Sequence, residues 1–148
     1  MDRLFIGSSD FDSIIASGAF FVDKTLFIKD FVESHAIVNI ILGPRRFGKS
    51  MNLNMLGSFL SGSSSSKRDI VQNYFRNSRV GRCQHLLDRH FGQHDVIYLS
   101  LKDCVADTWQ EMLETLWICI IDMFKPHLAE LSDAKELETC GKYQFLFL

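Results

Sequence analysis

Between residues 43 and 50 the chain reads Gly43-Pro44-Arg45-Arg46-Phe47-Gly48-Lys49-Ser50. This stretch fits the pattern Gly-x-x-x-x-Gly-Lys-[Ser/Thr] of phosphate-binding loops at every fixed position. Glycine tolerates positive φ and leaves no Cβ in the way, so successive backbone N–H groups can converge on a phosphate. We expect Lys49 to place its ammonium on the β- and γ-phosphates and the Ser50 hydroxyl to coordinate Mg²⁺. All eight residues are therefore candidate nucleotide-binding residues.

The segments on either side of this loop predict a strand and a helix. Residues 36–42 are mostly apolar and rich in β-branched side chains, as in a buried parallel strand. Residues 50–60 carry apolar side chains at helical spacing. This order suits a phosphate site, because a helix N-terminus adds partial positive charge and free N–H groups. The alternative is an ordinary turn beside a core strand.

Length and composition predict one globular domain. The chain has 148 residues, of which 47% are apolar and 23% charged, and this balance argues against disorder. A formal charge of −2 gives no general indication of nucleic-acid or membrane binding. No apolar run approaches the roughly 20 residues that cross a bilayer, and the start of the chain does not resemble a signal peptide.

The cysteines indicate the cellular compartment. Their wide and irregular spacing favours free thiols over a zinc site or a disulfide framework. We therefore expect a cytoplasmic protein, with the nucleus as the alternative. The four residues are Cys83, Cys104, Cys119 and Cys140.

The remaining pattern predicts an α/β protein whose parallel sheet is flanked by helices. A second buried strand is expected over residues 96–101, and the serine-rich residues 61–66 predict a flexible surface loop. Further helices are expected over residues 10–16, 23–34, 67–90 and 109–131, the last with a break near Pro126.

One segment of the chain is strongly basic. Residues 67–89 contain Lys67 and five arginines but only two aspartates. A solvated helix face is one interpretation, and a surface that contacts nucleic acid is the other.

A phosphate loop that hydrolyses nucleotide usually works with a second acid at the end of a strand, which holds Mg²⁺ or its water. Asp103 follows the predicted strand 96–101 and is the candidate, although an ordinary surface acid is the competing interpretation. Asp122 also ends an apolar run, but that run continues a helical period on both sides. Hydrolysis is therefore left open, while nucleotide binding is predicted.

The chain resembles the AAA-ATPase-like family of P-loop proteins over most of residues 5–125. Beside the loop, the resemblance rests on residues 6–12, on Phe21-Val22-Asp23-Lys24-Thr25 and on residues 96–103. It implies an ATP-binding α/β domain with Mg²⁺ as cofactor. Family members are longer, with a later acidic strand and often a nuclease-like domain. We therefore expect residues 1–148 to be the N-terminal portion of one such domain, with an incomplete sheet: a fragment, a truncated gene product or a degenerate relative.

Several roles stay open at this stage. Arg45 and Arg46 could balance phosphate charge or pair with a carboxylate or a partner. Asp23 and Lys24 could lie near the nucleotide or form a local salt bridge, and Thr25 is expected to start a helix. The alternatives to ATP binding are an interaction module with a relic loop and a nucleic-acid-associated protein.

Overall fold

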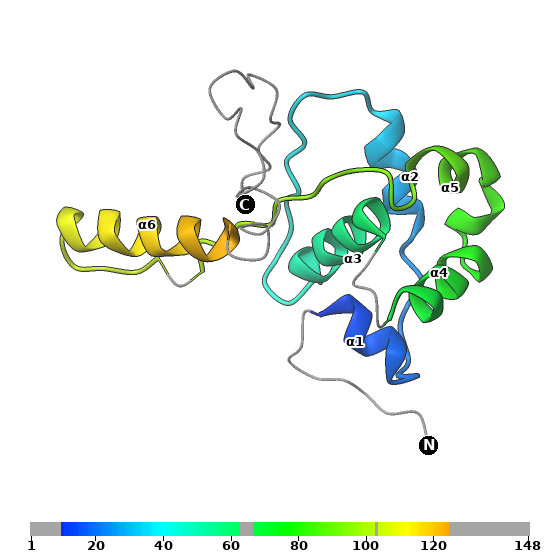
Figure 1. The fold of residues 1–148 in the computed structure, drawn as a ribbon, viewed down its shortest axis with the longest axis horizontal. Coiled ribbons are helices and arrows are strands. Elements are labelled where there is room, and N and C mark those ends of the chain that lie inside the picture. The colour runs from blue at the N-terminus through cyan, green and yellow to red at the C-terminus, as the bar shows by residue number, and fades with distance from the viewer. Residues whose placement is uncertain (1–9, 63–66, 103, 125–148) are drawn as a thin grey trace, which may run out of the picture. The chain divides into compact units, whose positions relative to one another are not determined.

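The computed structural model describes residues 10–62, 67–102 and 104–124, and Figure 1 shows the order of the elements along the chain. The chain divides into two compact units, Met1–Val96 and Ile97–Leu148. The first unit contains α1 (Phe11–Ala16), α2 (Leu26–Glu33), α3 (Lys49–Ser61), α4 (Arg68–Asn77), the 3₁₀ helix η1 (Val80–Arg82) and α5 (Gln84–His90). In the second unit the described residues form α6 (Trp109–Phe124).

The predicted parallel sheet is wrong. In the described parts of the chain every regular element is a helix, and residues 36–42 and 96–101 form no strand. Ile37 and Leu42 are each 86% exposed, so the segment before the loop is not buried. The apolar pattern indicated burial, but a strand also needs a neighbouring strand whose backbone forms hydrogen bonds with it. Residues 36–42 have no backbone hydrogen bond to another described segment.

The predicted helices are confirmed where the structure describes them. Asp10 caps α1, because its carboxylate accepts a hydrogen bond from the Ser13 N–H at 3.3 Å. Thr25 directly precedes α2, as expected. The predicted helix over residues 67–90 is divided into α4, η1 and α5. Residues 125–131 and 63–66, which carry the end of the last predicted helix and most of the predicted serine-rich loop, lie outside the described residues.

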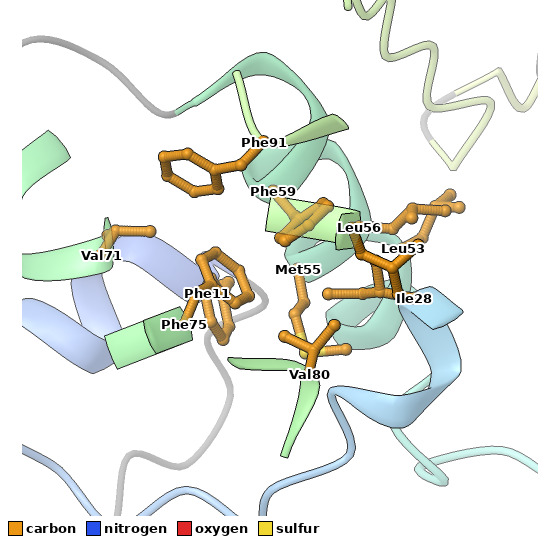
Figure 2. Packing of buried hydrophobic residues seen from close by; sticks show 11 residues of the cluster. Phe11, Ile28, Leu53, Met55, Leu56, Phe59, Val71, Phe75, Val80 and Phe91 are labelled. Atoms are coloured by element: carbon orange, nitrogen blue, oxygen red, sulfur yellow. The ribbon is translucent and has the colours of Figure 1, made fainter. Parts of the chain in front are cut away.

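An aromatic cluster forms the core of the first unit (Figure 2). Phe75 of α4 stacks on Phe11 of α1 at 5.4 Å between ring centroids and meets Phe59 of α3 edge to face at 5.2 Å. Phe91 closes the same group from the end of α5, 5.5 Å from Phe59. These contacts join α1, α3 and α4 around rings that are removed from water, and such burial is the main favourable term in folding.

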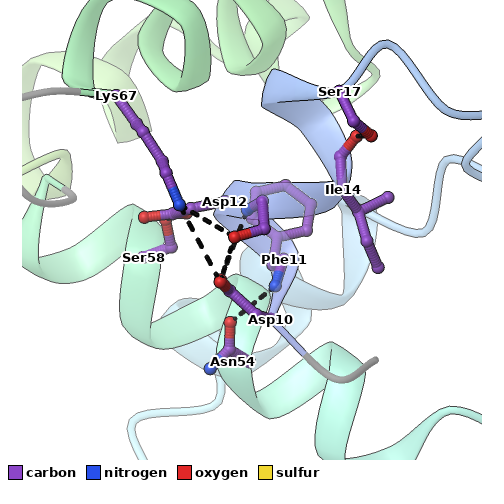
Figure 3. A network of polar contacts seen from close by, with 9 residues as sticks. Asp10, Phe11, Asp12, Ile14, Ser17, Asn54, Ser58 and Lys67 are labelled. Carbon is purple, nitrogen blue, oxygen red and sulfur yellow. Dashed lines mark hydrogen bonds and ion pairs between the residues drawn. The ribbon is translucent and has the colours of Figure 1, made fainter. Parts of the chain in front are cut away.

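Polar contacts fix α1 on the same neighbours (Figure 3). The Phe11 N–H donates to Asn54 Oδ1 of α3 at 2.9 Å, and the Ser58 hydroxyl donates to the Asp12 carboxylate. Lys67, just before α4, donates through Nζ to Ser13 Oγ at 2.8 Å. The first turn of α1 is therefore held against α3 and the start of α4 through the Phe11 N–H, the Asp12 carboxylate and the Ser13 hydroxyl.

The end of α3 is tied to the turn after α5. The Gly92 N–H donates to the Phe59 carbonyl at 3.0 Å, and the His94 N–H donates to the Leu60 carbonyl at 3.1 Å. These bonds satisfy carbonyls that a helix C-terminus leaves without an internal partner. The C-terminal end of α3 is anchored in this way, and its N-terminal end follows directly on the loop of residues 43–48.

Candidate phosphate site

The loop between residue 42 and α3 has two backbone conformations in the left-handed region. Gly48 has φ 80° and ψ 21° and caps the N-terminus of α3, and Arg46 has φ 67°. Glycine adopts this conformation without a steric penalty, whereas an arginine there costs of the order of 1 kcal/mol or more. Strained residues of this kind concentrate at functional sites. Residues 43–47 are exposed, so the loop faces solvent.

Lys49 holds the two ends of the loop together. Its ammonium donates to the Gly43 carbonyl and to the Pro44 carbonyl, both at 2.8 Å. Side chains on a helix tilt toward its N-terminus, which is why a lysine in the first turn of α3 reaches back over the loop. An ammonium has three donors, and the two carbonyls use two of them. One N–H therefore remains for an incoming anion.

Backbone donors at the start of α3 are also unused within the described part of the chain. The N–H groups of Gly48, Lys49 and Ser50 find no acceptor among the described residues. They belong to the start of α3, a helix of 13 residues whose first turn contains no acid. The positive end of the helix dipole and three unused donors favour an anion at this position. Ser50 is exposed, so its hydroxyl is accessible to solvent.

The side chains around the loop are basic and lack counter-ions. In the described part of the chain, no carboxylate lies within 4.0 Å of the charged nitrogens of Lys49, Arg45 or Arg46. The pairing of these arginines with a neighbouring carboxylate, which the sequence left open, is therefore not found among the described residues. A loop with this charge attracts anions and repels cations that carry no anion with them.

A further cation, the ammonium of Lys24, lies at the loop. The Lys24 ammonium lies 3.7 Å from the position that a Cβ would take at Gly48. Its neighbour Asp23 does not pair with it, since the Asp23 carboxylate accepts hydrogen bonds from Thr25 and from the Arg79 N–H. The sequence left two roles open for Lys24, a place near the nucleotide or a local salt bridge with Asp23, and that salt bridge is not found among the described residues.

A comparison with known families identifies the family of the chain. A family model described as "Predicted AAA-ATPase" matches residues 5–143. The chain belongs to the AAA-ATPase-like family. The matched span contains the whole loop and α1 to α6, so the resemblance drawn from the sequence is confirmed. No curated protein and no solved structure matches the chain.

The acid that the sequence proposed as a partner of the loop lies outside the part of the chain that the structure describes. Asp103, the candidate acid for Mg²⁺, lies outside the described residues. Asp122 lies on α6, as its helical period predicted. In the described ranges no group of three or more histidine, cysteine or acidic side chains is arranged to hold a metal ion. Among the described residues, Lys49 and Lys24 lie at the loop together with the unused N–H groups of α3, which are the basic and backbone donors of the candidate site.

Other surfaces of this AAA-ATPase-like chain carry separate features. In the basic segment 67–89, Lys67 forms an ion pair with the Asp10 carboxylate at 3.9 Å. The five arginines of the segment are exposed. They lie along α4, η1 and α5, and binding of nucleic acid by them stays a prediction. Within the described residues, no helix is long and apolar enough to cross a membrane.

Proposed function

We propose that this AAA-ATPase-like chain binds a nucleoside triphosphate, ATP, together with Mg²⁺, through residues 43–50. The observation that carries the proposal is the placement of Lys49. Its ammonium closes the loop on two carbonyls at 2.8 Å and keeps one donor for a phosphate oxygen. Hydrogen bonds from charged donors to phosphate are about twice as strong as neutral ones, so this contact contributes most to affinity.

The backbone supports the same ligand. The unused N–H groups of Gly48, Lys49 and Ser50 would each donate to a phosphate oxygen, with Arg45 and Arg46 adding positive charge. A polyphosphate carries the negative charge and the several acceptor oxygens that such a set of donors requires. A neutral ligand or a cation would leave these donors without partners, which costs free energy.

For Mg²⁺ the loop supplies fewer protein ligands than it does for phosphate. Ser50 supplies one exposed hydroxyl oxygen on the first turn of α3. Mg²⁺ keeps several waters and is commonly held by one or two protein oxygens together with phosphate oxygens. The ion would therefore bind with the nucleotide, and Ser50 would orient it beside the phosphates. The proposal covers binding, and hydrolysis would need additional groups that orient water and metal.

Thermal unfolding with and without Mg·ATP tests the proposal. At a nucleotide concentration about 100 times Kd, a ligand of the folded state stabilises it by about 2.7 kcal/mol. For a domain of this size that corresponds to a rise in Tm of roughly 5 to 10 °C. We expect this rise for the parent chain and its loss in Lys49→Ala. Lys29→Ala is the control, because Lys29 lies on α2 and pairs with Glu33 at 4.0 Å.

Two results would contradict the proposal. If Mg·ATP does not change the Tm of the parent chain, the loop is a structural relic and the interaction-module alternative gains support. If Lys49→Ala keeps the full rise in Tm, the nucleotide binds elsewhere. Comparing ATP with GTP in the same measurement then gives the base preference.

A further inference from the structure

Lys24 reaches the loop from a different element than Lys49. It lies two residues before α2, is exposed, and brings its ammonium to 3.7 Å from the Cβ position at Gly48. No carboxylate lies within 4.0 Å of its Nζ among the described residues. Gly48 is the residue whose N–H opens the donor set of α3. An anion bound to these N–H groups would therefore lie within reach of a second ammonium.

The backbone at Lys24 is held in place by its two neighbours. Asp23 Oδ1 accepts from the Thr25 N–H at 2.9 Å and from the Thr25 hydroxyl at 2.6 Å, while Asp23 Oδ2 accepts from the Arg79 N–H at 2.8 Å. Thr25 is fully buried, and its Oγ1 accepts from the Val80 N–H at 3.1 Å. Residues 23–25 are thus fixed to the start of η1. A fixed backbone lowers the entropy lost when the lysine orders on a ligand.

Among the described residues, Lys24 forms no ion pair with an acid. An exposed lysine usually lies beside an acid or in open water, and surface pairs contribute little. Here the adjacent acid is occupied by three other donors, and the ammonium lies close to Gly48, 3.7 Å from its Cβ position. Like charges at Lys24 and Lys49 repel, and a bound polyanion removes that repulsion.

The geometry points to Lys24 as a second phosphate-binding lysine, which donates to a phosphate oxygen of a nucleoside polyphosphate at the Gly48 end of the loop. This inference rests on the proposed function, because it assumes that the loop binds the phosphates. It adds a residue from outside the loop pattern. It also predicts that affinity for the nucleotide depends on two ammonium groups from two separate segments.

Titration of the full chain with Mg·ATP, followed by calorimetry, tests the inference. Loss of one charged hydrogen bond to phosphate should weaken binding roughly tenfold to hundredfold, so this is the change expected for Lys24→Gln. Lys24→Arg keeps the charge and should recover most of the affinity. Lys29→Gln is the control, because it removes a similar charge from α2, where Lys29 pairs with Glu33. It should change the affinity by less than about twofold.

The salt dependence gives a second readout that a merely structural role would not change. Raising salt from about 50 to about 300 mM weakens contacts between exposed charges. We expect the affinity of the parent to fall more steeply over this range than that of Lys24→Gln, with the Tm of the two unliganded proteins unchanged. If the parent binds Mg·ATP but Lys24→Gln has the same affinity and salt dependence, the inference is wrong and the proposed function stands. If the parent does not bind Mg·ATP, both are wrong.

Discussion

Gly62 and Gly92 lie so close together that the Gly62 position has no room for a side chain. A Cβ at Gly62 would lie 2.9 Å from the Gly92 Cα, closer than such atoms approach in folded proteins. This contact joins the end of α3 to the turn that follows α5, beside the hydrogen bond from the Gly92 N–H to the Phe59 carbonyl. The close approach therefore accompanies the anchoring of α3 at the end opposite the loop.

Substitution of Gly62 tests this contact. Gly62→Ala combines a positive φ of 77° with a backbone clash, so we expect a loss of about 2 to 4 kcal/mol in the free energy of unfolding. Gly18 is the matched control, because it has a similar φ of 67° but nothing within 4 Å of its Cβ position. Gly18→Ala should lose only about 1 to 2 kcal/mol. Urea unfolding measures both, and equal losses would contradict the close approach.

The aromatic core predicts a large effect at one face of α4. Phe75 is fully buried, whereas Ile70 on the same helix is 49% exposed. Phe75→Ala should lower the free energy of unfolding by about 3 to 5 kcal/mol, because it removes ring contacts and leaves a cavity. Ile70→Ala should cost less than about 1 kcal/mol. Urea unfolding of the two variants at the same pH checks the difference, and similar losses would place the core elsewhere.

Removal of the Tyr74 hydroxyl should not lower the free energy of unfolding, in contrast to removal of the Phe75 ring. It is buried without a hydrogen-bond partner among the described residues, and burial, followed by the charge of Asp23, raises the pKa of Tyr74 to about 12. An unpaired buried hydroxyl costs free energy, so Tyr74→Phe should leave the stability unchanged or raise it by up to about 1 kcal/mol. Tyr98→Phe, at an exposed position, is the control and should have no effect. A loss above about 1 kcal/mol in Tyr74→Phe would show that the hydroxyl is bonded.

Acid should weaken the anchor at Asp23. Burial acts to raise the pKa of Asp23, but hydrogen bonds from Thr25 and Arg79 outweigh it, and the pKa lies below its ordinary value of 3.8. A lowered folded-state pKa means that the stabilisation is complete above the ordinary value and is lost as the pH falls through the folded value. The parent should therefore be more stable than Asp23→Asn near pH 7, with a difference that shrinks below about pH 4. A constant difference down to about pH 2 would contradict this role.

Helices were predictable here because their signals are local. The apolar residues Met55, Leu56 and Phe59 recur at three- and four-residue intervals, and they are buried on α3. The loop was predictable for the same reason, since its residues are consecutive. Asp10 as a cap is likewise a local feature.

Features that depend on distant parts of the chain were not predictable. The apolar residues of 36–42 indicated a strand, but the pattern carries no information about whether a partner strand lies beside them. The position of Lys24 is of the same kind. Asp23 accepts a hydrogen bond from the N–H of Arg79, which is 56 residues away, and Thr25 accepts one from the Val80 N–H, so long-range contacts fix the segment. Sequence reasoning therefore found the phosphate-loop pattern, but it could give a place near the nucleotide only as one of two roles for Lys24.

The location of the loop also separates what the protein needs for folding from what it needs for binding. Lys24, Arg45 and Arg46 are exposed, Lys49 is half-buried, and none of them belongs to the aromatic core. Their loss should leave the fraction of unfolded chain nearly the same, and cellular quality control responds to that fraction. A variant that has lost the phosphate site would then persist at normal abundance and escape degradation. Selection could keep these side chains only through what they bind.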